Sequence, residues 1–73
     1  MATIDLRADI TGNVWKVLKV VGDNVAKDEP VLIIESMKME IPVLSPESGI
    51  IKEMLTREGE AVSDGTVVAR VDV

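Results

Sequence analysis

The chain has 73 residues, 47% hydrophobic and 29% charged, which is enough for one small domain and one modest core. The net charge of −5 argues against binding nucleic acid, and the absence of cysteine and histidine excludes a disulfide framework, a thiolate metal site and the commonest general base. The apolar runs are far shorter than the roughly 20 residues that cross a bilayer, and no secretory signal opens the chain. We therefore expect a soluble, monomeric, cytoplasmic protein with no catalytic or metal-binding residues of its own.

The first part of the chain is predicted to form short strands. Residues 4–8 alternate apolar and polar side chains, as in a strand with one face in water. A second strand begins near residue 12, and its alternation is spoiled over residues 16–21, where we expect a bulge or a twist. A glycine–aspartate turn at 22–23 leads to the apolar run 31–34. No window keeps the 3.6-residue period of a helix.

The next segment joins two strands through an unusual reversal. Lys38 lies between Met37 and Met39, after the run 31–34 and before the run 41–44. Tight reversals normally contain Gly, Asn, Asp or Pro, and none is present here. A local rule broken at one point suggests a functional site.

The acidic and thioether neighbours of Lys38 each allow two interpretations. Met37 and Met39 either fill gaps in the core or expose thioethers that dock onto partner enzymes. If the reversal is a two-residue hairpin centred on Met37 and Lys38, Glu35 faces Glu40, at a cost of about 0.5 kcal/mol. That acidic pair either marks the lysine for a modifying ligase, or is simply solvated in a different register.

The second half of the chain repeats the first. Gly12 and Gly49, and Gly22 and Gly59, are each 37 residues apart (49 − 12 and 59 − 22). The same offset matches apolar positions of the strands and divides the single domain, residues 1–73, into halves of about 1–37 and 38–73. We predict an all-β fold, a flattened antiparallel sandwich or barrel of about eight strands with two halves related by an approximate twofold axis. The offset pairs Lys38 with residue 1, so the lysine should lie at an exposed tip opposite the chain termini.

The remaining notable residues are predicted to be structural. The four repeated glycines fit turns that need positive φ or close packing. Trp15, the only aromatic residue, is expected in a core or half-buried packing role. The other four lysines are expected to be solvated charges, and these are Lys16, Lys19, Lys27 and Lys52.

Nearly the whole chain resembles the biotin/lipoyl attachment domains. The resemblance is carried by Gly12–Val17, Gly22–Val25, Pro30–Glu40, Ser45–Gly49 and Glu58–Val62. Met37-Lys38-Met39 resembles the Met-Lys-Met motif of biotinyl carrier domains, whose central lysine carries biotin. The chain is similar to the short stand-alone attachment proteins of bacteria. The resemblance implies a barrel-sandwich fold with the modified lysine on an exposed hairpin.

The same resemblance implies a carrier rather than an enzyme. A biotin protein ligase would join biotin to Lys38, a biotin carboxylase would load it with a carboxyl group, and a carboxyltransferase would pass that group to an acceptor. One alternative is a lipoyl carrier, modified by a lipoyl ligase, for a 2-oxo acid dehydrogenase or the glycine cleavage system. Lipoyl domains typically have Asp-Lys-Ala at this turn, which this chain lacks. The lipoyl alternative therefore implies that stand-alone attachment proteins accept either cofactor. Another alternative is an unmodified β-module that binds a protein partner.

Overall fold

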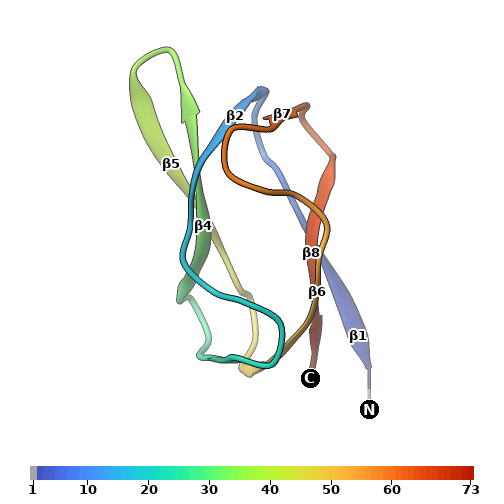
Figure 1. Cartoon of the computed structure of the whole chain (residues 1–73). Helices are drawn as coiled ribbons and strands as arrows, with labels where there is room; N and C mark the ends of the chain where they lie inside the picture. The colour runs from blue at the N-terminus through green and yellow to red at the C-terminus, as the bar shows by residue number, and fades with distance from the viewer. Residues whose placement is uncertain (1) are drawn as a thin grey trace.

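The computed structural model describes residues 2–73 as two four-stranded antiparallel sheets packed face to face (Figure 1). The strands are β1 (Thr3–Arg7), β2 (Gly12–Val17), β3 (Asn24–Val25), β4 (Pro30–Ser36), β5 (Met39–Leu44), β6 (Gly49–Met54), β7 (Ala61–Val62) and β8 (Val67–Asp72). One sheet has the order β1-β8-β6-β3 and the other β5-β4-β2-β7. The molecule measures 36 × 17 × 17 Å, so it is elongated. Residues 2–73 contain no helix long and apolar enough to cross a membrane.

The strand order confirms the predicted twofold repeat. Adding 37 to the bounds of β2 gives those of β6, and adding 37 to the bounds of β3 gives those of β7. Replacing each strand by its repeat mate turns the order β1-β8-β6-β3 into β5-β4-β2-β7, which is the second sheet. Each half therefore contributes strands to both sheets. The two sheets are consequently tied together by the chain as well as by the core.

The core lies between the two sheets and is made of small and medium aliphatic side chains. Inward-facing positions alternate with exposed ones along β1, where Leu6 is buried, and the alternation continues to Ala8, which is buried just after the strand ends. The core residues from the first half of the chain include Val14 and Val25, which are 1% and 3% exposed. The described residues place no aromatic side chain in this core, which is filled mainly by the branched side chains that sheets favour.

The predicted bulge in β2 lies earlier than expected. The register with β4 shifts between Val14 and Lys16, so Trp15 is the extra residue, and β2 ends at Val17. The bulge leaves Trp15 on the outer surface with 46% of its area exposed, so of the two predicted roles the core is wrong and the half-buried one is confirmed. The Lys16 Nζ lies 5.7 Å from the centroid of the indole ring. The repeat mate β6 has its own shift, between Ile51 and Glu53.

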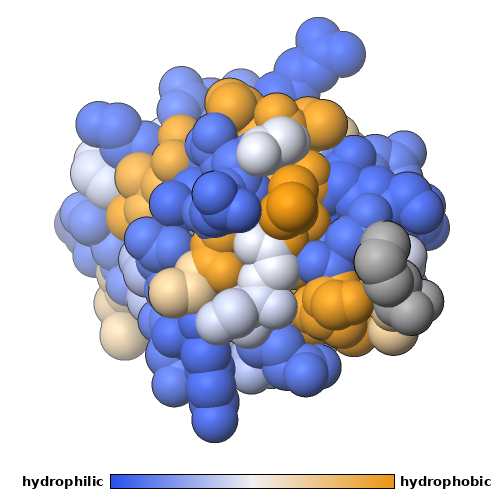
Figure 2. All heavy atoms as spheres, turned by 90° about the horizontal axis from the view of Figure 1, so that it is seen from below, coloured by the Kyte–Doolittle hydropathy of each residue, from blue (hydrophilic) through white to orange (hydrophobic). Residues whose placement is uncertain are grey.

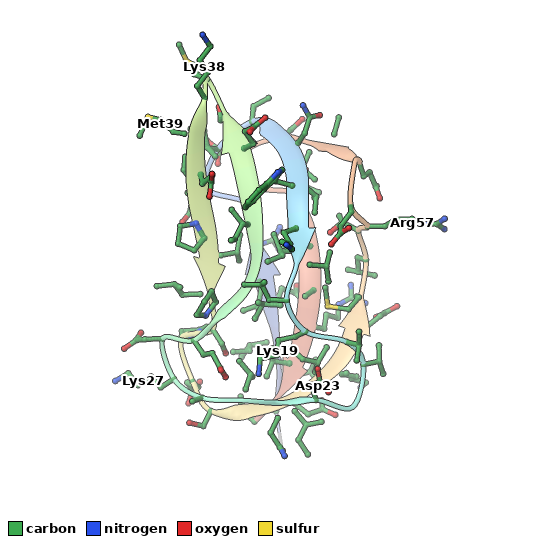
Figure 3. The ribbon with its side chains drawn as sticks, turned by 60° about the vertical axis from the view of Figure 1, so that its left-hand side comes forward. Lys19, Asp23, Lys27, Lys38, Met39 and Arg57 are labelled. Carbon is green, nitrogen blue, oxygen red and sulfur yellow. The ribbon has the colours of Figure 1, made fainter. Side chains whose placement is uncertain are left out.

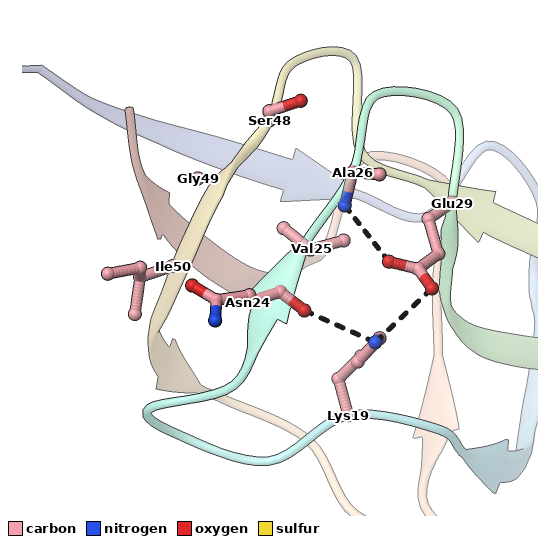
Figure 4. A pocket seen from close by; sticks show the side chains of 8 residues that line it. All are labelled: Lys19, Asn24, Val25, Ala26, Glu29, Ser48, Gly49 and Ile50. Atoms are coloured by element: carbon pink, nitrogen blue, oxygen red, sulfur yellow. Dashed lines mark hydrogen bonds and ion pairs between the residues drawn. The ribbon is translucent and has the colours of Figure 1, made fainter.

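Lys19 is not the freely solvated charge that we expected. Its Nζ donates to the Asn24 carbonyl oxygen at 3.2 Å and lies 3.3 Å from the Glu29 carboxylate (Figure 4). The Glu29 carboxylate also accepts a hydrogen bond from the Ala26 amide at 2.9 Å. The Ala26 hydrogen bond first, and Lys19 second, hold the pKa of Glu29 below its ordinary value of 4.5. Lys19 therefore braces the loop that leads from β3 into β4.

The two ends of the sandwich differ. The β4–β5 hairpin projects from one end, and the C-terminus and the start of β1 lie at the other (Figure 1). There Ala2 and Val73 exchange backbone hydrogen bonds at 3.3 and 2.8 Å. Viewed from below, this end is largely hydrophilic with apolar patches between the charged groups (Figure 2). The predicted separation of the hairpin from the termini is confirmed.

Candidate functional site

The candidate site is the tip of the β4–β5 hairpin, where Lys38 and Met39 point away from the body of the protein (Figure 3). The strands pair in register from Ile34 opposite Ile41 to Ser36 opposite Met39. That register leaves Met37 and Lys38 as the only residues of the loop. The two-residue reversal predicted from the sequence is therefore confirmed.

Both loop residues have a left-handed backbone conformation. The φ angles are 51° at Met37 and 65° at Lys38, the geometry of a type I′ turn. Glycine and asparagine normally fill such turns, and an ordinary side chain there costs roughly 1 kcal/mol per residue. The strain is held in place by the paired strands on both sides. A turn built for stability alone would use other residues, which is why this one points to function.

The side chains at the tip are open to solvent. Met37 is 92% exposed and Met39 63%, so a core role for these thioethers is excluded. Lys38 is also exposed, and it takes part in none of the ion pairs formed within residues 2–73. The tip therefore presents one primary amine between two apolar, flexible side chains, at the far end of a 36 Å molecule.

The two glutamates next to the tip face each other directly. Glu35 pairs with Glu40 across the hairpin, and both are exposed, so the alternative register is wrong. Since the pair closing a two-residue loop is hydrogen-bonded, the next pair is the non-hydrogen-bonded kind, in which side chains lie closer. The two negative charges repel each other, which destabilises the hairpin. The result is a pair of facing carboxylates, separated from the Met37–Lys38 loop by the one residue pair Ser36 and Met39.

The end of β4 just below the turn is held by hydrogen bonds that the sequence did not predict. The Ser36 Oγ donates to the Thr11 carbonyl oxygen at 2.9 Å, and the Thr11 Oγ1 accepts from the Asp64 amide at 3.2 Å. Ser48 and Lys27 are the repeat mates of Thr11 and Asp64, and the Ser48 Oγ likewise accepts a hydrogen bond from the Lys27 amide, at 3.1 Å. A hydroxyl residue at both positions, 37 residues apart, was therefore the sequence signal that could have identified Thr11. The Ser36 bond has no counterpart in the repeat, because the residue 37 positions later is a valine.

Gly12 lets the hairpin lie close to β2. A Cβ built at this position would collide with the carbonyl oxygen of Glu35 and lie 3.1 Å from the Cβ of Ser36. The prediction that this glycine serves close packing is therefore confirmed, and the packing concerns the strand that bears the tip. Of the four repeated glycines, Gly22 and Gly59, with φ of 95° and 88°, serve positive-φ turns.

The other lysines differ from Lys38 in their surroundings. The Lys52 Nζ lies 3.9 Å from an Asp72 carboxylate oxygen, and Lys16 and Lys19 have the partners described above. Lys27 is the nearest equivalent of Lys38, because it is exposed, lies in a turn and forms none of the ion pairs within residues 2–73. It lies near the opposite end of the molecule (Figure 3) and has no thioether neighbours. Lys27 is therefore a control for any property of Lys38 that depends on its position at the hairpin tip.

Residues 5–71 match the biotin/lipoyl family described as "Biotin-requiring enzyme". The chain belongs to the biotin/lipoyl attachment family. Over 59 residues it is 48% identical to a biotin/lipoyl attachment protein of Bacillus subtilis, covering 81% of each chain. Over 65 residues it is 37% identical to a protein of Mycobacterium leprae described as a biotinylated protein TB7.3 homolog, covering 89% of this chain and 92% of that one.

The solved structures agree on the fold of this biotin/lipoyl attachment domain. It superposes on the urea carboxylase of Kluyveromyces lactis with a TM-score of 0.92 and 35% identity, covering 99% of this chain but 6% of that one. Homologous domains also lie within carboxylases and within components of 2-oxo acid dehydrogenase complexes. The family therefore includes both biotin and lipoyl attachment domains. The all-β sandwich predicted from the sequence is the fold of that family.

Proposed function

We propose that this chain is a biotin carrier and that the Lys38 amine is its point of attachment. The observation that carries the proposal is the exposed amine, which forms none of the ion pairs within residues 2–73, between the two exposed thioethers of Met37 and Met39 on a positive-φ turn. Its open position suits an amine that must enter the site of a ligase. The Met-Lys-Met sequence supports biotin over lipoate.

Lys38 would be joined through a new amide bond. Its Nζ, as the free amine, would attack the carboxyl carbon of a cofactor activated as its adenylate, the bond from that carbon to the adenylate oxygen would break, and AMP would leave. The ammonium group loses two protons in all, so the positive charge of the side chain disappears, as it does on acetylation. Once attached, biotin supplies a ureido nitrogen that takes up and releases a carboxyl group. The chain itself contributes reach and a high local concentration of the attached group.

The partners in this proposal are enzymes that visit the tip in turn. A biotin protein ligase modifies Lys38, and a biotin carboxylase and a carboxyltransferase then use the loaded carrier. The acidic pair Glu35 and Glu40 lies close enough to the tip to be contacted by any enzyme that surrounds the lysine. We propose that it contributes to recognition by the ligase. The chain acts in the cytoplasm as one carrier domain.

A lipoyl carrier is the second candidate. It is favoured by the similarity to a dihydrolipoyllysine-residue succinyltransferase component of the 2-oxoglutarate dehydrogenase complex, 38% identical over 68 residues and covering 16% of that protein. The turn geometry suits either cofactor, because both are joined to a lysine amine. In this case a lipoyl ligase would modify Lys38, and a 2-oxo acid dehydrogenase or the glycine cleavage system would use it.

Intact mass and peptide mapping test these proposals. The chain would be co-expressed with a biotin protein ligase or with a lipoyl ligase, and the mass gained identifies the attached group. We expect one biotin per chain on Lys38, none on Lys38→Arg, and normal labelling of the control Lys27→Arg. Biotin on any other lysine, or robust labelling of Lys38→Arg, would contradict the assignment. Efficient labelling by the lipoyl ligase alone would favour the second candidate.

A further inference from the structure

The outer faces of the two sheets carry their charges differently. On the β1-β8-β6-β3 sheet, the Arg70 Nε lies 3.0 Å from a carboxylate oxygen of Asp5, and its Nη1 lies 2.9 Å from one of Glu53. Arg7 and Lys52 also pair with acids on strands of this sheet. Four of the five ion pairs formed within residues 2–73 therefore lie on this sheet, and none lies on the strands of the β5-β4-β2-β7 sheet.

The equivalent row of the other sheet is built from different residues. Its members are each 37 residues from their counterparts, so the repeat mates of Asp5, Arg70 and Glu53 are Pro42, Ile33 and Lys16. This second set is the Ile33 row, and it pairs across three strands as the first set does, with Ile33 in the place of Arg70. Because the same row is built from paired charges in the other sheet, the fold does not require apolar side chains here.

The Ile33 row lies on the outside of the sheet whose strands β4 and β5 form the projecting hairpin (Figure 1). Ile33 stands between two fully buried residues of β4, so its side chain points to the outer face, where it is partly exposed. Pro42 is exposed on β5, which is an edge strand of the sheet. The bulge in β2 places the exposed Trp15 next to Lys16, whose ammonium group lies over the indole. An aliphatic side chain, a proline ring and an indole therefore share one solvent-facing surface.

Two carboxylates on the same face lie between the Ile33 row and the tip. Side chains two residues apart in a strand share a face, so Glu35 and Glu40 lie on the face of Ile33. Neither glutamate takes part in the ion pairs formed within residues 2–73. Ile33 is four residues before Met37, which is about 13 Å along the strand. An enzyme that surrounds the tip can therefore reach the acidic pair and the Ile33 row together.

We propose that the Ile33 row, with Trp15 and the pair Glu35 and Glu40, is a docking surface for the biotin protein ligase. This inference rests on the proposed function and extends it from the tip to the body of the domain. The two carboxylates, in a chain of net charge −5, favour a partner surface with basic side chains. The apolar side chains favour an apolar group beside those bases, because docking then removes apolar area from water.

A second copy of this chain is a poorer fit to the same surface. In a symmetric pair, each copy would bring Glu35 and Glu40 into one interface, where like charges repel. The outer face of the other sheet is also a poorer fit to the ligase, because its charged row already has partners within the chain. The ligase should therefore approach the domain from the side of the Ile33 row.

A row-exchange variant tests this surface. Lys16→Glu, Ile33→Arg and Pro42→Asp together copy the ion-paired row of the other sheet into this one, and the fold accepts that row at the equivalent position. The matched control is Lys52→Glu, at an exposed residue of β6 in the other sheet. Both variants change the net charge from −5 to −7 (−2 + 1 − 1 and −2). Circular dichroism and melting temperatures would establish that both are folded.

The readout is the steady-state kinetics of biotin attachment by a biotin protein ligase, with the chain as the varied substrate. We expect the row exchange to raise KM at least about tenfold, because it removes the central contacts of the docking surface. The value of kcat should change less than about twofold, because Lys38 and its turn are untouched. Lys52→Glu should leave both constants within about twofold of the native values. The native KM should rise with salt, which screens the attraction of Glu35 and Glu40 for basic side chains.

Two further measurements keep the test decisive if the row exchange proves less stable. Ile33→Thr with Pro42→Ser removes apolar surface without adding charge, and it should raise KM about threefold or more. The Lys38→Arg chain cannot be labelled, so it should compete with the native chain for the ligase. It should lose this ability when it also carries the row exchange.

The inference would be overturned by an unchanged KM in the folded row exchange and in the double variant. An equal rise in KM for Lys52→Glu would overturn it too, since the effect would then belong to the net charge. A native dimer in sedimentation that the row exchange separates would assign the surface to a second copy instead. Failure of the ligase to label the native chain at all would contradict the proposed function.

Discussion

Gly12 and Gly49 offer a matched pair of substitutions that separates the stability of the fold from the position of the tip. They are repeat mates, and each begins a strand that lies close to the backbone of a neighbour. In Gly12→Ala the new Cβ meets the Glu35 carbonyl oxygen and comes within 3.0 Å of Ile34 Cγ2. In Gly49→Ala it meets the Asp72 carbonyl oxygen and comes within 2.9 Å of Val71 Cγ1.

The two substitutions should cost similar free energies of unfolding. The obstructing atom is a backbone oxygen in both cases, so the strand must move because no side chain can rotate away. Overpacking of this kind costs about 1–3 kcal/mol. Replacing glycine by alanine returns about 0.5–1 kcal/mol by restricting the unfolded chain. We expect a net loss of about 1–2 kcal/mol for each variant, or about 4–16 °C in melting temperature for a domain of this size.

Their effects on loading should differ. Gly12→Ala displaces β4 at Glu35 and Ser36, just below the turn that holds Lys38. Gly49→Ala displaces the end of β8, at the opposite end of the molecule. Stability would be measured by urea melts, and loading by the initial rate of biotin attachment to the native fold. We expect a several-fold slower rate for Gly12→Ala and a rate close to that of the native chain for Gly49→Ala. Equal rates at equal loss of stability would refute the reasoning.

Three further predictions concern stability. Lys38→Ala should change the free energy of unfolding by no more than about 0.5 kcal/mol, whereas Val14→Ala should lose about 2 kcal/mol in urea melts. Glu40→Gln should stabilise the hairpin by about 0.5 kcal/mol, because it removes the repulsion with Glu35, and this gain should vanish at high salt. Because the pKa of Glu29 is lowered in the folded state, its stabilising effect is present above pH 4.5 and is lost as the pH falls through the lowered pKa. Urea melts of Glu29→Gln should therefore show a larger loss at pH 7 than at pH 3.

The repeat made most of the fold predictable. Alternation and turn residues identify short strands locally, and the 37-residue offset then relates every strand to a mate in the other half. The sequence left two registers open for the β4–β5 hairpin, one with Glu35 facing Glu40 and one without. The structure decides for the first. A one-residue slip would move all the core residues of a strand to the solvent side, which is the physical reason for this register.

The features that the sequence did not predict depend on contacts between distant segments. The position of the β2 bulge is set by the register with β4, and the alternation within β2 alone placed it too late. The same bulge turns the Trp15 side chain to the outer surface, where it is half-buried. Lys19 is braced by Glu29, which lies across a loop. The hydrogen bond from Ser36 to Thr11 joins residues 25 apart in the sequence. It is formed in only one half, because the repeat mate of Ser36 is a valine, so the repeat could not predict it. The roles of the site residues and the cytoplasmic location stay predictions.

The site lies where the duplication is broken. A sandwich of two related halves has two similar ends, and the chain can connect the halves at only one of them. At that end Ser36 leads into the turn and β5 follows. At the other, the mate of Ser36 is Val73, which pairs with Ala2 through backbone hydrogen bonds. The turn at Met37 and Lys38 joins the two halves and has no counterpart within either half of the described residues, so its side chains can serve chemistry rather than folding. The family includes attachment domains for both cofactors on one scaffold, so we propose that the side chains beside Lys38, chiefly Met37 and Met39, contribute to the choice between them.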